Sequence, residues 1–161
     1  MVGITYTIMT SPLGRILVAR NAEGLTCINF QDGTEAVSPQ AGWRERASDL
    51  ADATAQLEAY FRGELQQFEI PLAPYGTTFQ RQVWQTMRAI PYGQTLTYAE
   101  LARRVGRPQA ARAVGGASSC NPLPVVVPCH RVVGSDGSLT GYAGGLHLKQ
   151  ALLDLERGKQ P

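Results

Sequence analysis

Short runs of apolar residues, each followed by turn residues, dominate the first 30 positions of the chain. The turn segments, rich in Gly, Pro and Asn, lie at residues 11–14 and 21–24. Between and around them lie three runs with many β-branched residues, at 4–9, 15–19 and 25–30. Three strands joined by two short turns predict an antiparallel meander. The polar stretch that follows, residues 31–47, predicts a loop.

The hydrophobic spacing changes to a helical period after residue 48. One helical face carries Leu50, Ala53, Leu57, Tyr60 and Phe61. Ser48 is a residue type favoured at a helix N-cap, and Gly63 is one that favours a helix end. We interpret residues 67–70 as one more strand. Residues 1–74 therefore predict a small α+β domain with an antiparallel sheet.

Amphipathic helices follow a Pro- and Gly-containing linker at residues 71–76. The first is predicted by the apolar face of Phe79, Val83, Trp84, Met87 and Ile90, and it ends at Pro91 and Gly93. Thr97 and Glu100 have the capping-box spacing, which opens a second helix that ends at Gly106. Pro108 suits the first turn of a third helix, which runs to about residue 118. The last two helices predict a helix-turn-helix.

The second helix of this pair has unusually small side chains. Apart from Arg112, residues 110–117 are only Ala, Val and Gly, and each of the two glycines costs about 1 kcal/mol in a helix interior. A helix that reads the major groove of DNA presents several long polar side chains. A smooth helix with one Arg instead fits a narrower groove, with the Arg as an inserted probe. Tight packing against another helix is the alternative explanation.

The end of the chain combines an apolar run with a helix. Residues 125–127 are three valines before Pro128, which predicts a short strand. In the closing helix, Leu148, Ala151, Leu152 and Leu155 share one face, and Lys149, Leu153 and Glu156 share another. Residues 75–161 therefore predict a mostly helical domain, and the whole chain belongs to the mixed α/β (α+β) class.

Composition excludes several classes of protein. A hydrophobic content of 43% argues against disorder, and an odd count of three cysteines argues against a disulfide scaffold. Apolar runs stay well short of the roughly 20 residues that span a bilayer. The N-terminal residues show no export-signal pattern. We therefore expect a cytoplasmic protein with reduced thiols.

Charge is distributed unevenly along the 161 residues. Residues 1–74 hold five Arg and nine Asp or Glu, a net charge of −4. Residues 75–161 hold ten Lys or Arg and four Asp or Glu, a net charge of +6, which gives the formal total of +2. This asymmetry indicates that only the second half meets a polyanion, with a chance difference between the halves as the alternative.

Cys129 is the candidate reactive residue among the three cysteines. Cys27 lies in an apolar strand and fits a core position, while Cys120 has no evident activator. Cys129 is followed by His130 and an arginine, and an imidazole or a cation favours the nucleophilic thiolate. Adjacent side chains on a strand point to opposite faces, so cooperation between Cys129 and His130 requires a backbone turn, which Pro128 favours.

Other chemistry has weaker signals. Glu156 could orient a histidine in a cysteine–histidine–acid arrangement, although an isolated Glu near a chain end is ordinarily solvated. The two His and three Cys include no pair at zinc-ligand spacing, so no metal is predicted. His147 fits an exposed helix position.

Residues 128–132, Pro-Cys-His-Arg-Val, resemble the active-site signature of the O6-alkylguanine-DNA alkyltransferases, also called methylated-DNA–protein-cysteine methyltransferases. The family's order continues on both sides of this segment, through Tyr98, the Ala-Arg-Ala-Val-Gly-Gly helix at 111–116, Asn121-Pro122, Tyr142 with its Gly pair, and Glu156, 27 residues after Cys129. The resemblance covers nearly all of residues 75–161. The N-terminal half matches in size and element order only.

The resemblance implies direct transfer of an alkyl group from the O6 atom of guanine to Cys129. His130 would deprotonate the thiol through a bound water, and Glu156 would orient and polarise His130. Asn121 would brace the active-site turn by hydrogen bonds. The thioether product has no leaving path, so each molecule should act once.

The resemblance also implies how damaged DNA is held. The small helix, with Ala111 and Gly115, would lie in the minor groove, and Arg112 would fill the space vacated in the base stack. Tyr98 would crowd the 3′ phosphate and help to rotate the damaged nucleotide out. Three residues would hold the flipped base, the side chain of Tyr142 and the backbone around Val132 and Ala143.

These implications define the expected partners and the alternatives. We expect a monomer that binds double-stranded DNA bearing O6-alkylguanine and uses neither cofactor nor metal. The preferred alkyl size, activity on O4-alkylthymine and cooperative binding stay open. Cys129 argues against the related non-catalytic class, which lacks the acceptor cysteine. Two other functions stay as alternatives, a DNA-binding regulator or lesion-recognition module with an inert thiol, and a cysteine–histidine–acid hydrolase.

Overall fold

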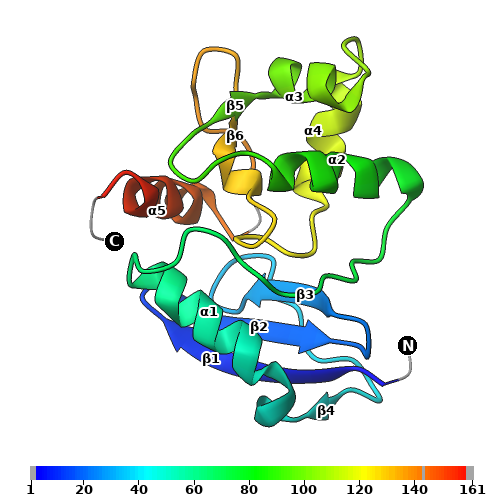
Figure 1. Ribbon diagram of the computed structural model, residues 1–161, viewed down its shortest axis with the longest axis vertical. Coiled ribbons are helices and arrows are strands. Elements are labelled where there is room, and N and C mark those ends of the chain that lie inside the picture. Colours follow the sequence, from blue (N-terminus) through cyan, green and yellow to red (C-terminus); the bar gives the residue numbers. More distant parts are fainter. Residues whose placement is uncertain (1–2, 143, 159–161) are drawn as a thin grey trace.

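The N-terminal half is built on a small twisted sheet. The computed structural model describes residues 3–142 and 144–158. Strands β1 (Thr5–Ser11), β2 (Gly14–Arg20) and β3 (Leu25–Phe30) form the predicted antiparallel meander, and the sheet order is β3-β2-β1-β4 (Figure 1). Strand β2, the middle strand of the meander, is buried on both faces from Ile16 to Ala19. The pairings confirm the predicted meander, which was readable from the sequence because apolar runs and turn residues are local signals.

The predicted loop at 31–47 is wrong over two residues. Strand β4 (Arg44–Glu45) pairs in parallel with β1, and the flanking amides of Arg44 and Arg46 donate to the carbonyls of Ile4 and Tyr6 at 3.1 and 2.9 Å. This short strand occupies backbone groups along the free edge of β1, so it needs no apolar pattern of its own.

Helix α1 (Ala51–Phe61), which the apolar period predicted, lies across one face of the sheet (Figure 1). Its start differs from the prediction, because Ser48 belongs to a 3-10 turn, η1 (Ala47–Leu50), and does not cap the helix. Gly63, with a φ of +75°, follows the helix end as expected. The helix buries Leu57 and Tyr60 completely.

No strand forms at residues 67–70, contrary to the prediction. The side chain of Gln56 binds both backbone groups of Glu69, accepting from its amide at 2.9 Å and donating to its carbonyl at 3.2 Å. The chain meets the sheet just afterwards, where Leu25 donates to the Pro71 carbonyl at 2.9 Å and Ala73 donates to the Leu25 carbonyl at 2.8 Å. A helix side chain therefore replaces the ladder partner that a strand would need.

The C-terminal half is mostly helical. Helices α2 (Thr78–Arg88), α3 (Tyr98–Val105) and α4 (Ala111–Ser119) pack on one another, and α5 (Leu146–Glu156) lies beside the N-terminal half (Figure 1). Strands β5 (Leu96–Thr97) and β6 (Val132–Val133) form a small parallel pair. Together with the sheet of the other half, these elements confirm the mixed α/β class.

Caps define the boundaries of the helix-turn-helix. The Thr97–Glu100 capping box is present, and Gly106 ends α3 in the left-handed conformation, with a φ of +87°. The next helix begins at Ala111, so the prediction that Pro108 lies in its first turn is wrong. A separate turn, in which Ala110 donates to the Arg107 carbonyl at 2.9 Å, precedes α4. Residue types that suit a first helical turn also suit such a turn, which explains the misassignment.

The predicted strand at 125–127 is instead a turn. Val127 donates to the Leu123 carbonyl and Cys129 donates to the Val127 carbonyl, both at 2.8 Å. Val125 has a φ of +77°, which is unusual for a β-branched residue. All three valines are buried. A short apolar run indicates burial but not strand geometry. The flanking prolines also lack the N–H groups that strand pairing would need.

The two halves share one apolar core. Buried side chains from the sheet and α1 join those of α2–α5 in a continuous cluster. Backbone also crosses the junction, where Ile28 of β3 donates to the Pro122 carbonyl at 2.8 Å. The sheet therefore packs directly against the segment that leads to Cys129. In the described part of the chain, no helix is both long and apolar enough to cross a membrane.

Candidate functional site

Cys129 opens a tight turn at the junction of the two halves. Residues Cys129–Arg131 form a single 3-10 turn, η2, directly after Pro128 and before β6. The backbone turn that cooperation between Cys129 and His130 requires is therefore present. Cys129 lines a hollow of about 10 Å³ together with Asn121, Tyr142 and residues at the end of α4. This is the space of about one water molecule.

His130 is completely buried and contacts Glu156. Its Nε2 lies 2.6 Å from Oε2 of Glu156, which comes from the last turn of α5. The other ring nitrogen, Nδ1, has no hydrogen-bond partner among the described residues. Glu156, which in isolation would be expected in solvent, is thus a buried partner of the histidine beside Cys129.

The Glu156 carboxylate accepts from several donors in addition to His130. Arg131 donates from Nε to Oε1 at 2.8 Å and from Nη2 to Oε2 at 2.9 Å. The Tyr60 hydroxyl donates to Oε2 at 2.6 Å, and the Gly93 amide donates to Oε1 at 3.2 Å. With His130, these donors come from three separate segments of the chain, at residues 60, 93 and 130–131, so the carboxylate lies at a convergence point of the fold.

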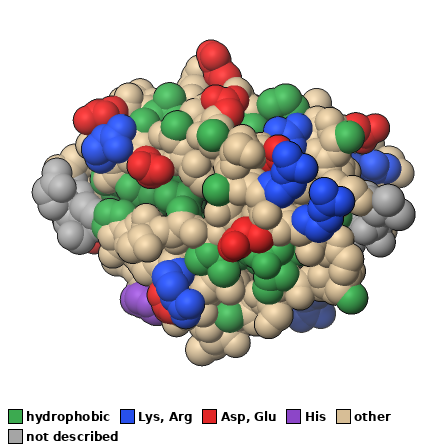
Figure 2. All heavy atoms as spheres, turned by 90° about the horizontal axis from the view of Figure 1, so that it is seen from below, with side chains coloured by type: hydrophobic (Ala, Val, Ile, Leu, Met, Phe, Trp, Pro, Cys, Tyr) green, Lys and Arg blue, Asp and Glu red, His purple; other side chains and the backbone are tan. Residues whose placement is uncertain are grey.

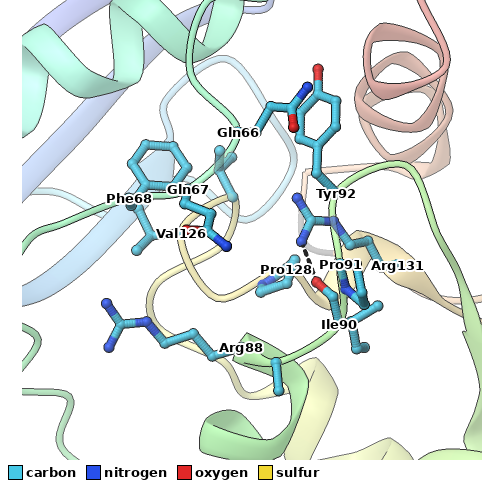
Figure 3. A pocket seen from close by; sticks show the side chains of 12 residues that line it. Gln66, Gln67, Phe68, Arg88, Ile90, Pro91, Tyr92, Val126, Pro128 and Arg131 are labelled. Atoms are coloured by element: carbon cyan, nitrogen blue, oxygen red, sulfur yellow. Dashed lines mark hydrogen bonds between the residues drawn. The ribbon is translucent and has the colours of Figure 1, made fainter.

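Arg131 is itself fixed on its far side. Its Nη1 donates to the Ile90 carbonyl at 2.6 Å, and its guanidinium lies 5.7 Å from the ring centre of Tyr92 (Figure 3). The hollow drawn in Figure 3, about 310 Å³ in volume, is lined by Arg131 and Tyr92 but not by Cys129. Every nitrogen of this guanidinium therefore has a partner before any ligand binds.

Burial and hydrogen bonding set the charges of the site. Burial would raise the pKa of Glu156, but hydrogen bonds from His130 and Arg131 outweigh it and hold this pKa far below its usual range. Burial lowers the pKa of His130, so the imidazole is neutral near pH 7. Burial raises the pKa of the Cys129 thiol, against the opposing effects of Asn121 and Lys149. The resting site therefore holds a protonated thiol beside a neutral imidazole.

Asn121 bridges the two ends of the turn that precedes Cys129. Its Nδ2 donates to the Val127 carbonyl at 2.9 Å, and its Oδ1 accepts from the Leu123 amide at the same distance. Both bonds hold backbone within a few residues of the thiol. The side chain of Asn121 therefore ties together the segment that carries Cys129.

Of the residues expected around the flipped base, Tyr142 lines the hollow at the thiol. The buried hydroxyl of Tyr142 makes no hydrogen bond of good geometry within the described residues, yet it lies close enough to oppose the rise in the pKa of Cys129. Its ring packs at 6.3 Å from that of Phe30, on β3 of the other half. Val132 is completely buried in β6. Ala143, the third residue expected around the base, lies outside the described residues.

Lys149 is a buried cation that the sequence did not single out. Its Nζ donates to the Val132 carbonyl at 2.6 Å and to the Thr140 carbonyl at 3.0 Å. The Thr140 hydroxyl in turn donates to the Tyr98 hydroxyl at 3.1 Å. The only sequence signal for Lys149 is its place on the same helical face as Glu156.

Helix α4 has small residues on its outer face. Arg112 and Gly116 are exposed, whereas Val114 and Ala117 pack inward and the Ala117 carbonyl accepts from the Trp84 indole at 2.8 Å. A methyl group added at Gly116 would meet nothing within 4 Å. Tight helix packing therefore does not explain Gly116.

The remaining predicted DNA contacts lie close to this helix. Tyr98 begins α3, and a methyl group added at Gly115 would lie 3.6 Å from its ring. Ala111 is partly buried at the start of α4. At the opposite end of the molecule, acidic and basic side chains are interspersed on the surface (Figure 2).

The other cysteines and candidate metal ligands lie outside this arrangement. Cys27 is part-buried in β3, and burial raises the pKa of its thiol to about 11. Cys120 is exposed, and so is His147. Within residues 3–142 and 144–158, no group of three or more His, Cys, Asp or Glu side chains could hold a metal ion.

Comparison with known proteins identifies the family. Residues 78–158 match the profile described as 6-O-methylguanine DNA methyltransferase, DNA binding domain, and residues 4–74 match the ribonuclease-like domain of the same family. The chain belongs to the 6-O-methylguanine DNA methyltransferase family. It is therefore a DNA-repair methyltransferase whose alkyl acceptor is a cysteine of the protein itself.

Individual relatives agree over nearly the whole chain. A methylated-DNA–protein-cysteine methyltransferase of Methanosarcina acetivorans is 50% identical over 151 residues, which is 94% of this chain and 97% of the relative. One from Mycolicibacterium paratuberculosis is 48% identical over 98% of this chain and 95% of the relative. The crystal structure of Mycobacterium tuberculosis OGT in complex with DNA superposes with a TM-score of 0.90, at 42% identity over 98% of this chain and 95% of that chain.

Proposed function

We propose that this methyltransferase repairs O6-alkylguanine in duplex DNA by a single irreversible transfer of the alkyl group to Cys129. The observation that carries this proposal is the placement of Cys129 at the start of η2, next to a buried His130–Glu156 pair. Of the three thiols, only Cys129 lies next to an imidazole in the sequence. The family membership supplies the reaction class, and this geometry supplies the acceptor.

The reaction begins with removal of the thiol proton. A neutral His130 takes the proton of Cys129 through a water molecule at Nδ1, while Nε2 faces Glu156. The sulfur lone pair then attacks the alkyl carbon, the S–C bond forms, and the C–O6 bond breaks with its electron pair on the guanine. Guanine takes up a proton as it leaves, and the proton that His130 received is released, so that the thiol proton is balanced overall. The thioether cannot be displaced, so one protein molecule is consumed for each lesion.

Glu156 makes the proton transfer favourable by its fixed charge. The imidazolium that forms during the reaction gains an attraction to a carboxylate that is already ordered by other donors. Asn121 holds the turn that aims the sulfur, through its bonds to the backbone at residues 123 and 127. In this arrangement Cys129 rests as a thiol and becomes the thiolate nucleophile only when His130 takes its proton.

The damaged base must leave the helix to meet the thiol, since O6 of a paired guanine is not open to in-line attack. The small outer face of α4, with the exposed Gly116 and the half-buried Ala111 and Gly115, suits close approach to the minor groove, and Arg112 is the one long side chain on it. Arg112 would take the place of the flipped base. Tyr98, beside Gly115, would press on the 3′ phosphate.

The flipped base would lie between Tyr142 and the backbone at Val132 and Ala143. The hollow at Cys129 has a volume of about 10 Å³, whereas a purine is many times larger than one water. Base entry therefore requires the walls around Tyr142 and Gly141 to part. We propose that the extent of this movement decides which alkyl groups are accepted, and whether O4-alkylthymine is a substrate.

The proposed partner surface belongs to the C-terminal half alone. The +6 charge of residues 75–161 supports binding to DNA that weakens with salt, while the −4 half faces away. We propose that residues 1–74 and 75–161 are two domains joined through their shared apolar core, and that the protein binds as a monomer. Whether neighbouring monomers bind cooperatively is an outcome of the binding assay below.

Intact-mass spectrometry after incubation with O6-methylguanine duplex DNA tests the proposal. The expected product is heavier by one methylene equivalent, at one per chain, with the modified peptide containing Cys129. Cys129→Ala should show no gain, and the matched control Cys120→Ala should react normally. A duplex titration by fluorescence anisotropy at several salt concentrations measures affinity and cooperativity.

The alternative functions give different results in the same experiment. A lesion-recognition module with an inert thiol would bind the duplex without any gain in mass. A cysteine–histidine–acid hydrolase would turn over an ester or amide many times without retaining the alkyl group. Either result would exclude the proposed transfer.

A further inference from the structure

The N-terminal half contributes one side chain directly to the buried acid of the site. The Tyr60 hydroxyl, on α1, donates to Oε2 of Glu156 at 2.6 Å, across 96 residues of sequence. The same oxygen lies 2.6 Å from His130 Nε2. Tyr60 and His130 therefore compete for the charge on one oxygen atom.

Packing holds the Tyr60 ring in place. It lies between Phe61 and Phe68, each at 5.4 Å between ring centres, and Tyr92 at 6.2 Å, and it has no solvent-exposed surface. Burial keeps its pKa well above the ordinary range, so the hydroxyl stays protonated at working pH. Tyr60 is thus a protonated hydroxyl donor that ring packing holds against Glu156.

We propose that Tyr60 is a positioning residue for alkyl transfer, through which the N-terminal half fixes Glu156 Oε2 and limits the charge that this oxygen offers to His130. The inference rests on the proposed proton transfer to His130. The N-terminal half would thus take part in the reaction although it carries neither Cys129 nor helix α4. Tyr60 touches no reacting atom and acts only through Glu156.

The physical reason is the balance that His130 requires. An unshared carboxylate at 2.6 Å would strongly favour the imidazolium, and a histidine that is already protonated cannot accept the thiol proton. Each additional donor to Glu156 weakens that preference without removing the oriented contact. Tyr60 does this with a neutral group, so it adds no charge next to His130.

Other charged and titratable groups face the same pair. Arg131 and Lys149 disfavour the imidazolium by their charge, and a Cys129 thiolate would raise the pKa of Lys149. Tyr92 lies close enough to Glu156 for the carboxylate to affect its own pKa, after burial. None of these is altered when only the Tyr60 hydroxyl is removed, so a Tyr60→Phe variant isolates its effect.

The first test is the pH dependence of single-turnover methyl transfer by Tyr60→Phe. With the donor removed, Glu156 offers more charge to His130, and the imidazolium persists to higher pH. The acidic limb of the rate profile should move upward by about half to one pH unit. The rate loss should consequently be several-fold at mildly acidic pH and smaller above neutral pH. Tyr92→Phe, which removes a hydroxyl from an adjacent ring, should leave the limb in place.

The second test does not depend on activity. Titration of the His130 ring by ¹⁵N NMR should show the same upward movement in Tyr60→Phe and none in Tyr92→Phe. A purely structural Tyr60 would lower the unfolding temperature while leaving the rate profile and the NMR titration unchanged, and that result would overturn the proposal. If the wild-type protein fails to take up methyl groups, the proposed function fails, and the NMR titration still decides whether Tyr60 acts on His130.

Discussion

Arg131 binds both oxygens of the Glu156 carboxylate, at 2.8 Å from Nε to Oε1 and 2.9 Å from Nη2 to Oε2. Both side chains are almost completely removed from solvent. The residue that follows His130 in sequence thus orders the acid that His130 needs. A buried charge of this kind depends on its partner far more than an exposed one does.

Replacement of Arg131 by Ala should destabilise the protein strongly. The variant leaves Glu156 without its cationic partner in the interior, and loss of one member of a buried pair typically costs about 3–5 kcal/mol. The free energy of unfolding in urea measures the effect. The matched control is Arg62→Ala, because Arg62 pairs with Glu64 on the surface at 3.0 Å and should be nearly neutral. Equal stability of the two variants would contradict a structural role for the Arg131–Glu156 pair.

Replacement of Lys149 by Met should weaken the backbone support of the proposed base site while leaving Cys129 in place. The Val132 and Thr140 carbonyls would each lose a donor, and an unpaired buried group costs about 1–3 kcal/mol. We expect slower methyl transfer at unchanged affinity for undamaged duplex, measured by rapid quench and by anisotropy. Gln150→Met, one residue away and exposed, is the control. A Lys149→Met protein with normal transfer rate would show that the hydrogen bonds of Lys149 to the Val132 and Thr140 carbonyls are not needed for transfer.

Acid should destabilise the protein in two steps. The pKa of His130 is lowered in the folded state by burial, so the unfolded chain binds a proton first and stability falls as the pH drops through about 6.5. The pKa of Glu156 is also lowered, so a further loss begins as the pH falls through about 4.3. Urea unfolding at a series of pH values measures both. His130→Gln should lack the upper step, and persistence of that step would assign it to another group.

Local signals in the sequence predicted much of the fold. The meander, the Thr97 capping box and the end of α3 at Gly106 each depend on a few neighbouring residues. The turn at Cys129 was predicted as a requirement for the chemistry and is present as η2. The strand expected at 125–127 was wrong because three buried valines suit a buried turn as well as a strand.

Long-range polar contacts were not predictable in the same way. Tyr60 fitted an apolar helical face, and nothing in the sequence indicates that its hydroxyl meets an acid 96 residues away. Lys149 fitted a helix face that could as well have been solvated. The pairing of His130 with Glu156 was expected from the family resemblance. Arg131 as the second partner of Glu156 was not, since residues that order a catalytic group leave no periodic pattern.

Arg112→Ala should separate base flipping from chemistry. The exposed Arg112 is the one long side chain on a helix of small residues, so its proposed role is to occupy the vacated stack. The variant should repair duplex DNA at least tenfold more slowly, the equivalent of about 1.4 kcal/mol. It should react almost normally with the free base O6-benzylguanine. Comparable losses on both substrates would show that Arg112 does not assist flipping.

Gly116 offers two tests, one of stability and one of DNA binding. A methyl group at this exposed position meets nothing within 4 Å, and Ala exceeds Gly in helix propensity by about 1 kcal/mol. Gly116→Ala should therefore raise the free energy of unfolding. If α4 lies in the minor groove, the larger Gly116→Leu should still fold but bind duplex many-fold more weakly, because the smooth face is lost. Ala55→Leu, which places the same side chain on the exposed surface of α1 in the other half, is the control. Normal duplex binding by Gly116→Leu would place the DNA elsewhere than on α4.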